Sequence, residues 1–474
     1  MDDSLIIYVV ASMVTVMAIS CWRRRCQKSL APVPSGSLGW PLIGETIKFV
    51  ACAYSSRPES FMEKRQCLYG KVFKSHLFGK PTIVSTDPEV SKFILQSVSE
   101  DFVPFFPGSL TELVGKSSIL VINGSLQRRV HGLIGSFFKS PILKAHITAD
   151  MQRDLQEIMA SWRDDQIVYI QEEAKYMVFQ IMVKTLIGLG PGEHLQFLRH
   201  QYQKFVAGII SIPVKIPGTR FYRSLQAKKR MMKLVKYIIQ EKKKNNTGCI
   251  SRDIIDAFLN DGSGQLTDDL ILDNVIDLMI PAEDSVPVLI TLAIKYLSDC
   301  PLVLQKLKEE NTKLKHKSLE GEDLQWMDYM SLSFTQNVIS ETLRMGNIIP
   351  AVMRKAIKDV EVKDHFIPEG WCVLPYFRSV HLDKEIYDDA YKFNPWRWKD
   401  KDTAASSFTP FGGGQRLCPG IDLSRLIASI FLHHLVTGFT WVAEEDHMVN
   451  FPTVRMQRNM PIKVKRKNID ILLS

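Results

Sequence analysis

The segment FTPFGGGQRLCPG, residues 408–420, constrains this chain more than any other part of its sequence. Three consecutive glycines and Arg416 precede Cys418, and Pro419 and Gly420 follow it. Glycine accepts positive φ and lets backbone N–H groups approach a neighbouring atom closely, because it has no Cβ. An apolar helical pattern begins directly afterwards, and the positive end of its dipole favours negative charge on the sulfur. The segment therefore predicts a cradle for a cysteine thiolate, with a buried free cysteine in a turn as the plainer alternative.

The other cysteines do not suggest a second function for sulfur in this chain. They lie at positions 21, 26, 52, 67, 249, 300 and 372, and no two of them form a CxxC pair. Their spacing indicates neither a disulfide framework nor a zinc site. Free thiols in a reducing compartment fit this pattern, so Cys418 has to be explained by itself.

The charge of the chain is basic and unevenly distributed. The net charge is +9 over 474 residues, and many of the cations lie between Arg220 and Lys244. A solvated helix face explains such a run, and contact with anionic lipid or an acidic protein is the alternative. We expect no nucleic-acid partner, because no recognisable binding motif accompanies the charge.

The N-terminal residues have the composition of a membrane anchor. Residues 5–22 carry no charge, two aspartates precede them, and a basic cluster follows at residues 23–28. Eighteen helical residues rise about 27 Å, which suits the thin bilayer of the endoplasmic reticulum. The positive-inside rule then places the N-terminus in the lumen and the body in the cytosol. A cleaved signal peptide is the alternative, but it usually has a basic start.

The rest of the chain is predicted to form one body that is mainly α-helical with small β-sheets. We expect an anchor at residues 1–22, a basic and proline-rich hinge at 23–45, and a catalytic domain at 46–474. Helical periodicity dominates from about 125 to 345, with a proline-marked break at 211–220. Strands are expected at 71–86, with a turn near Gly79–Lys80, at 360–377, and among the last forty residues.

The cysteine segment resembles that of the cytochrome P450 superfamily, whose haem iron takes one axial cysteine thiolate. The resemblance rests on the pattern F-x-x-G-x-R-x-C-x-G, formed by Phe411, Gly414, Arg416, Cys418 and Gly420. It implies the P450 fold, haem b with Cys418 as the ligand of the iron, and insertion of one oxygen atom from O2 into a C–H bond. The chain has no GxGxxG after a strand, so electrons from NADPH are expected through a partner, NADPH–cytochrome P450 reductase.

Two further motifs occur in the order that this family has. SETLRMG places Glu341 and Arg344 one helical turn apart, and FNPWRW supplies Arg397. The resemblance implies that these three residues form a structural network behind the haem. Taken alone, such a pair is as typical of a solvated helix face.

The apolar helical pattern of residues 276–297 is interrupted by Pro281 and Pro287. Each proline lacks an N–H, so the carbonyls of Asp277 and Glu283 are predicted to lose their helical partners. Such an opening could admit water or oxygen, and a kinked core helix is the plainer alternative.

The resemblance assigns catalytic roles between these prolines, with Asp284 as the acid and Ser285 as the alcohol of proton delivery. The family more often has glycine at the position of Ala282 and threonine at that of Ser285. Serine keeps the hydroxyl but lacks the β-branch that fixes its rotamer, so we expect proton delivery with looser coupling.

Several charged or polar side chains are candidates for holding the haem propionates. Gln127 and His131 stand where the family often has tryptophan and arginine, and Arg354 stands where it has a further propionate-binding arginine. Each of these could instead be an ordinary surface group. The cofactor-binding candidates besides Cys418 are Arg416, Arg354, Gln127, Arg128, His131 and Phe411.

Apolar segments at residues 101–120, 205–217 and 348–352 suit a pocket for a large lipid. From about residue 36 to 465, stretches such as SLGWPLIGETIKFV resemble the plant brassinosteroid side-chain hydroxylases. The branch implied acts at C-23 of 22-hydroxylated campestane sterols such as 3-epi-6-deoxocathasterone. Ile349, Pro350 and Ala282 are the candidate substrate contacts, and Pro350 departs from that branch.

Two other functions remain open from the sequence. One is a steroid hydroxylase of specialised metabolism that oxidises C-22 or C-26 of cholesterol-type sterols. The other is a haem-bound sterol-binding protein with weak turnover, which Ala282 and Ser285 make conceivable.

Overall fold

The computed structural model describes residues 31–467 except 42, 56, 98–99, 246–251, 320–322, 400–406 and 452. The expected anchor, residues 1–22, and the start of the expected hinge lie outside the described residues. The helices are α2 (Thr46–Ala53), α3 (Ser60–Tyr69), α4 (Pro88–Gln96), α5 (Gly108–Val114), α6 (Gly124–Lys139), α7 (Pro141–Ala160), α8 (Ile170–Ile187), α9 (Glu193–Val206), α10 (Arg220–Asn245), α11 (Ile254–Leu259), α12 (Asp268–Asp277), α13 (Pro281–Asp284), α14 (Val286–Asp299), α15 (Pro301–Leu319), α16 (Trp326–Ser331), α17 (Ser333–Gly346), α18 (Phe377–His381) and α19 (Ile421–Gly438), with 3₁₀ turns η1 (Pro395–Trp398) and η2 (Gly414–Arg416).

The strands are short and form four small sheets. They are β1 (Val72–Leu77), β2 (Lys80–Ser85), β3 (Phe102–Pro104), β4 (Ile167–Tyr169), β5 (Arg354–Ala356), β6 (Val360–Val362), β7 (His365–Ile367), β8 (Cys372–Pro375), β9 (Phe439–Ala443), β10 (Met448–Val449), β11 (Arg455–Met456) and β12 (Pro461–Arg466). One sheet has five strands in the order β1-β2-β8-β5-β3, a second has three in the order β4-β12-β9, and β6-β7 and β10-β11 form pairs. The prediction of a mainly helical chain with small sheets is confirmed.

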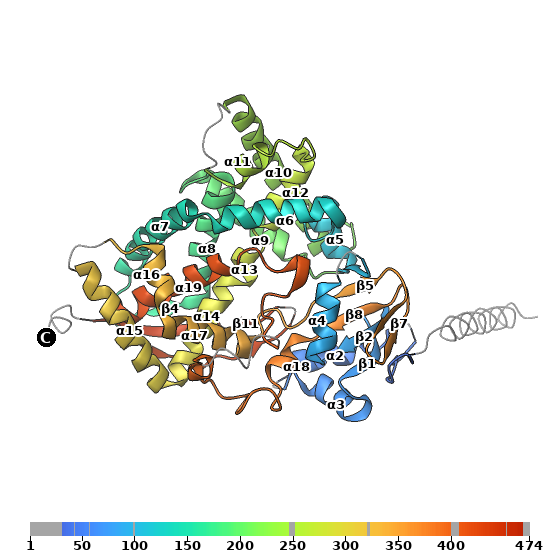
Figure 1. Cartoon of the computed structure of the whole chain (residues 1–474). Coiled ribbons are helices and arrows are strands. Elements are labelled where there is room, and N and C mark those ends of the chain that lie inside the picture. The colour runs from blue at the N-terminus through green and yellow to red at the C-terminus, as the bar shows by residue number, and fades with distance from the viewer. Residues whose placement is uncertain are drawn as a thin grey trace, which may run out of the picture.

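Helices and the five-stranded sheet occupy different parts of the molecule (Figure 1), with the sheet on one side and the helical body on the other. In the sheet, β2 and β8 run parallel, so residues near 84 and 374 lie side by side although they are far apart in sequence. The hairpin of β1 and β2 turns at Phe78 and Gly79, where φ is 53° and 77°. Positive φ at two central residues marks a tight hairpin turn, one residue earlier than the sequence predicted.

The largest core cluster lies in the helical body, and α14 runs through it. Every residue from Val286 to Ile294 is buried, because α14 packs against α8, α17 and α19 on different sides. A helix that is apolar all round is stable only in such a place. The same packing brings the helix that follows Ser285 beside the helix that follows Cys418.

The helix break predicted at Pro281 is present, but its hydrogen bonding differs from the prediction. The carbonyl of Asp277 accepts a hydrogen bond from the N–H of Ile280 at 3.0 Å, so it is not left unpaired. The chain tightens into 3₁₀-type turns between α12 and α13, which supply i to i+3 partners. The Tyr202 hydroxyl also donates to the carbonyl of Met279 at 3.0 Å. The break is therefore an ordered feature of the core.

The described end of the proline-rich segment lies against the sheets. The carbonyl of Pro32 accepts from the N–H of Phe366 on β7, and the carbonyl of Ser35 accepts from that of Lys74 on β1, both at 3.0 Å. Among the described residues, no single helix has the length and apolar character that a membrane span requires. One pair of helices meets the criterion only jointly, Asp268–Asp299 with Pro301–Lys317, and it bends by 116°.

Candidate active site

Cys418 lies between η2 and the start of α19, in a loop whose glycines serve two purposes. Gly414 has φ +62°, and a Cβ added there would come within 2.2 Å of the Leu95 carbonyl oxygen on α4. A Cβ on Gly413 would meet the Leu95 side chain at 3.3 Å. Gly413 and Gly414 therefore let the loop pack closely on α4, whereas the expected approach of a glycine N–H to the sulfur is made by Gly420.

The Cys418 sulfur receives a backbone hydrogen bond from Gly420, the residue directly before α19. The N–H of Gly420 is directed at the Cys418 sulfur and lowers the pKa of the thiol, while burial raises that pKa by more. The N–H of Cys418 donates to the Phe411 carbonyl at 3.1 Å, which closes the loop. Burial without a cation thus keeps this thiol protonated, and a bound metal cation would stabilise its thiolate.

Arg354 is buried and Arg416 is half-buried with a buried Nε, and their like charges repel one another. Burial lowers the pKa of Arg354 to about 10. Burial and the nearby charge of Arg354 lower the pKa of Arg416 to about 10. The Nε atoms of both arginines have no hydrogen-bond partner among the described residues. The buried Nε2 of Gln127 also lacks a partner there. Buried cations need an anionic partner, so this region fits a ligand with negatively charged groups.

These observations are a test of whether the chain fits haem. One cysteine sulfur could bind iron, and the unpartnered donors of Arg354, Arg416 and Gln127 could bind the two propionates of haem. The residues present therefore fit the cofactor that the sequence implies.

The remaining nitrogens of Arg416 bond the segment that precedes α6. Nη1 donates to the Ile119 carbonyl at 2.9 Å, and Nη2 donates to Asn123 Oδ1 at 2.7 Å. Arg416 thus joins the cysteine loop to residues 119–123, and its Nε has no partner among the described residues.

The other propionate candidates are placed unequally. Gln127 Oε1 accepts from Gln415 at 2.5 Å, and His131 Nε2 donates to the Leu417 carbonyl at 2.7 Å. Arg128 is exposed on the surface of α6. The structure therefore brings Gln127 and His131 to the cysteine loop and leaves Arg128 outside it.

Asp284 and Ser285 occupy the interruption between α13 and α14. Burial, and next the charge of Glu283, raise the pKa of Asp284 to about 6, against lowering contributions from Lys175, Arg455 and a Thr453 hydrogen bond. Glu283 forms an ion pair with Lys175 of α8 at 2.6 Å. A carboxyl group with a pKa near 6 gains and loses protons readily close to neutral pH.

Ser285 caps α14 in a backbone conformation outside the helical region, with φ −126° and ψ −72°. Ser285 and Asp284 are both half-buried, so each keeps some accessible surface. Thr453 and Lys175 come from segments far away in sequence. No local pattern could have indicated them.

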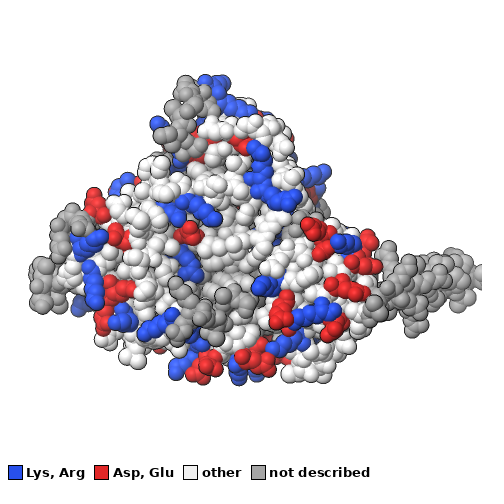
Figure 2. All heavy atoms as spheres, in the orientation of Figure 1, with Lys and Arg blue, Asp and Glu red and all other residues white. Residues whose placement is uncertain are grey.

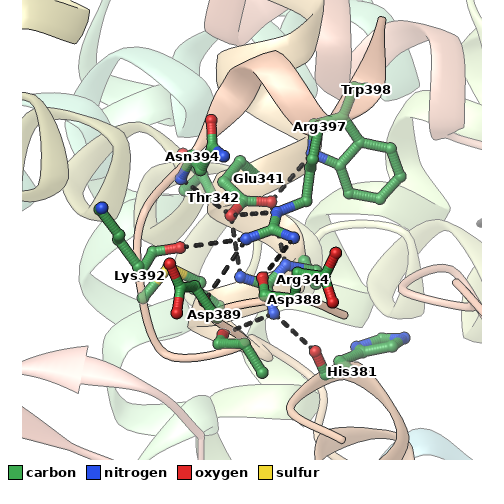
Figure 3. A network of polar contacts seen from close by, with 12 residues as sticks. Glu341, Thr342, Arg344, His381, Asp388, Asp389, Lys392, Asn394, Arg397 and Trp398 are labelled. Carbon is green, nitrogen blue, oxygen red and sulfur yellow. Dashed lines mark hydrogen bonds and ion pairs between the residues drawn. The ribbon is translucent and has the colours of Figure 1, made fainter. Parts of the chain in front are cut away.

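The carboxylate of Glu341 is the centre of a buried network (Figure 3). It accepts from Arg344 Nε at 2.9 Å and Nη2 at 2.8 Å, and from Arg397 Nε at 3.0 Å. The indole N–H of Trp398 and the backbone N–H of Asn394 add bonds of 2.9 Å and 3.0 Å. The three charged residues suggested by the sequence thus meet, while Trp398 and Asn394 were missed although they belong to the same FNPWRW motif.

The candidate substrate contacts differ in exposure. Ile349 is 39% exposed and Pro350 is half-buried, in the loop between α17 and β5. Ala282 has no exposed surface and belongs to the main core cluster. The structure thus leaves Ile349 and Pro350 accessible to a ligand, whereas Ala282 is enclosed by protein.

The chain is similar to several known proteins. The family model described as "Cytochrome P450" matches residues 34–466. The chain is 63% identical to "Cytochrome P450 90D2" of Oryza sativa subsp. indica, over 93% of this chain and 90% of that protein. It is 58% identical to "3-epi-6-deoxocathasterone 23-monooxygenase CYP90D1" of Arabidopsis thaliana, over 91% and 89%.

A second Arabidopsis thaliana protein named as a 3-epi-6-deoxocathasterone 23-monooxygenase, CYP90C1, is 52% identical over 92% of this chain and 85% of its own. Among solved structures, "Retinoic acid bound cyanobacterial CYP120A1" superimposes with a TM-score of 0.82 at 22% identity, over 93% of this chain and 100% of that one. That likeness concerns the fold alone.

The sulfur assignment is tested by Cys418→Ala. We expect this variant, produced with haem supplied, to lose the Soret band that thiolate ligation gives to the reduced carbon monoxide complex, because the substitution removes the sulfur of the loop that contacts Gln127 and His131. Cys300→Ala, which removes a partly buried thiol elsewhere, is the control and should keep the band. A band retained by Cys418→Ala would show that the ligand lies at another residue.

Proposed function

The chain belongs to the cytochrome P450 family, and from this premise we propose that it hydroxylates C-23 of 22-hydroxylated campestane sterols in brassinosteroid biosynthesis. The observation that carries the proposal is the 58% and 52% identity, over most of each chain, to two enzymes named as 3-epi-6-deoxocathasterone 23-monooxygenases. The buried thiol group and the unpartnered Nε atoms of Arg354 and Arg416 support the haem chemistry that this reaction needs. The substrate is then a sterol that already carries a hydroxyl group at C-22.

Haem bound at this site supplies the activation of dioxygen for insertion into an unactivated C–H bond. Cys418 would provide the thiolate, while Arg354, Arg416 and Gln127 would hold the propionates. The propionates would give the Nε atoms of the two arginines the anionic partners that they lack among the described residues.

Asp284 and Ser285 deliver protons to the oxygen side of the site. The carboxyl of Asp284 holds a proton below a pH of about 6 and releases it above, and the neighbouring Glu283 is held in its ion pair with Lys175. Asp284 therefore changes its protonation near neutral pH. The Ser285 hydroxyl, at the start of α14, can pass a proton inward because a hydroxyl both donates and accepts.

The chain further depends on a redox partner and a membrane. Electrons from NADPH come from the membrane-bound NADPH–cytochrome P450 reductase, as the family requires a redox partner. Residues 1–22 anchor the protein in the endoplasmic reticulum with its body in the cytosol. An apolar surface supports this location, since Ile210, Ile212 and Ile216 between α9 and α10 are 52%, 79% and 63% exposed.

Charge on the described surface is compatible with such an orientation. Figure 2 shows Lys and Arg gathered near α10 and α11, and both signs interspersed over the rest of this face. Cations next to an apolar loop favour the surface of a membrane that contains anionic lipid.

Incubation with a sterol panel tests the reaction. Microsomes containing the full chain, reductase and NADPH should convert 3-epi-6-deoxocathasterone to a product with a new hydroxyl at C-23, identified by mass spectrometry and NMR. Cholesterol and its 22-hydroxylated derivative serve as competing substrates. Oxidation of C-22 or C-26 instead, or NADPH use without any sterol product, would contradict the proposed function and favour the other hydroxylase or the sterol-binding protein.

Asp284→Asn tests proton delivery. The variant keeps the shape of the side chain but cannot exchange a proton, so we expect product per NADPH consumed to fall at least about tenfold, with haem content unchanged. In the wild-type chain this ratio should decrease as pH rises through about 6, because the protonated carboxyl is the donor. Asp299→Asn, in an exposed ion pair on the same α14, is the matched control. An unchanged ratio and pH profile in Asp284→Asn would exclude the role.

The membrane anchor is tested by two lysines placed in the apolar stretch, Val10→Lys with Val14→Lys. Each lysine disfavours insertion of a helix centre by about 3 kcal/mol, so the variant should leave the microsomal pellet on carbonate extraction. Ile212→Lys in the apolar loop is the comparison and should stay in the pellet. The reverse result would place the membrane contact at the loop and contradict the anchor.

A further inference from the structure

Three successive residues before Cys418 are each bonded to the segment 119–131. Gln415 donates to Gln127 Oε1, Arg416 donates to the Ile119 carbonyl, and the Leu417 carbonyl accepts from His131 Nε2. These three hydrogen bonds have lengths of 2.5, 2.9 and 2.7 Å, respectively. This segment comprises the loop before α6 and the first turns of that helix. The residues that lead to the sulfur are therefore held by one neighbouring element.

Two of these contacts come from one face of α6. Gln127 and His131 are four residues apart, so their side chains lie one above the other on the helix surface. Opposite them, Gln415 and Leu417 are two residues apart in the cysteine loop. Helix α6 is itself fixed, since Val130 and Ile134 are fully buried in the main core and the helix packs on α7 and α19. The loop thus has two anchor points on a rigid surface.

The His131 contact fixes the peptide group that adjoins the cysteine. In the peptide between Leu417 and Cys418, the carbonyl accepts from His131 Nε2 at 2.7 Å. The N–H of the same peptide donates to the Phe411 carbonyl at 3.1 Å. With both ends bonded, this peptide cannot rotate without losing a hydrogen bond. Its N–H is thereby kept on the Phe411 carbonyl, and the main chain at Cys418 keeps one orientation relative to the Gly420 N–H that bonds the sulfur.

The bond also defines the protonation of His131. A carbonyl oxygen only accepts hydrogen bonds, so His131 carries a proton on Nε2 and directs that proton at the loop. This nitrogen is consequently engaged and not available to a haem propionate. Of the two α6 side chains that contact the cysteine loop, Gln127 has the donor without a partner among the described residues, its buried Nε2.

We propose that His131 is a positioning residue for the axial sulfur, which acts by holding the peptide between Leu417 and Cys418 in one orientation. Without it, that peptide can turn within a loop that contains two glycines at positive φ, Gly412 and Gly414. Rotation of this peptide would shift the main chain at Cys418 and weaken the hydrogen bond from the Gly420 N–H, which withdraws charge from the sulfur. With haem bound, the sulfur would then be the stronger donor, so the reduction potential would decrease and the thiolate would take up a proton more easily. This inference rests on the haem–thiolate ligation of the proposed function and is independent of the sterol.

The alternative role for His131, a bond to a haem propionate, predicts a different outcome. A propionate ligand contributes to haem retention, and its loss lowers haem content without changing how firmly the sulfur is held. A positioning residue changes the potential and the lifetime of thiolate ligation in the molecules that retain haem. Measurements on the haem-containing fraction therefore separate the two roles.

The test uses the full-length, haem-loaded chain with His131→Phe, which keeps a ring without a donor, and His131→Gln, which keeps an N–H donor. We expect His131→Phe to convert from the thiolate-ligated to the inactive carbon monoxide complex about fivefold faster, as the loss of one neutral hydrogen bond of about 1 kcal/mol implies. Its reduction potential should be more negative than that of the wild-type chain. His131→Gln should restore both quantities most of the way.

Arg128→Gln, the exposed neighbour on α6, is the matched control and should behave as the wild-type chain. If His131→Phe does not fold, His131→Asn, whose donor is too short to reach the loop, should give the same two changes. Wild-type conversion rate and potential in the folded variants would overturn the proposal, and so would haem loss alone with an unchanged potential. Neither readout involves a sterol, so a failure here is distinct from the absence of a C-23 product.

Discussion

The buried carboxylate of Glu341 is the interaction on which the arrangement of this site depends. A charge with no exposed surface is tolerated only when hydrogen bonds replace its lost hydration, and five donors do so here. Four of them come from two segments, α17 and η1, so the carboxylate joins these segments in the core. Removing either side of such a buried pair typically costs about 3–5 kcal/mol. The network therefore fixes α17 relative to the segment that leads to the cysteine loop.

Contacts continue from this network to the beginning of the loop. The indole of Trp398 packs against Phe408 in a tilted arrangement with ring centroids 4.4 Å apart, and the N–H of Thr409 donates to His381 Nε2 at 3.1 Å. Arg344 reaches the same place, since its Nη1 donates to the His381 carbonyl at 2.7 Å. The loop is thus held at its start by the Glu341 network and at its end by α6. Its many glycines do not make it mobile, because neighbouring elements supply the order that its own backbone lacks.

How much of this was visible in the sequence depends on whether a residue acts within its own segment. Cys418, the pair Glu341 and Arg344, and the helix break at Pro281 could be read from local spacing, and so could the mainly helical fold. The close packing of Gly414 on α4 and the approach of Lys175 to Glu283 could not, because both depend on tertiary contacts between distant segments. Gln127 and His131 were identified by their positions. Their engagement with the cysteine loop could be seen only once the hydrogen bonds were known.

Desolvation shifts the pKa values of the arginines and of Asp284 in this site, and it does so with different consequences. On the carboxylate edge, Arg354 is buried and Arg416 half-buried, the Nε of each has no partner among the described residues, and desolvation lowers the pKa of each to about 10. At the helix break, desolvation raises the pKa of Asp284 to about 6. Desolvation disfavours the charged form in both cases. The consequence differs, because an arginine at about 10 remains a cation that demands a partner, whereas a carboxyl at about 6 becomes a proton carrier. One physical effect thus produces a binding edge in one place and a proton-transfer group in the other.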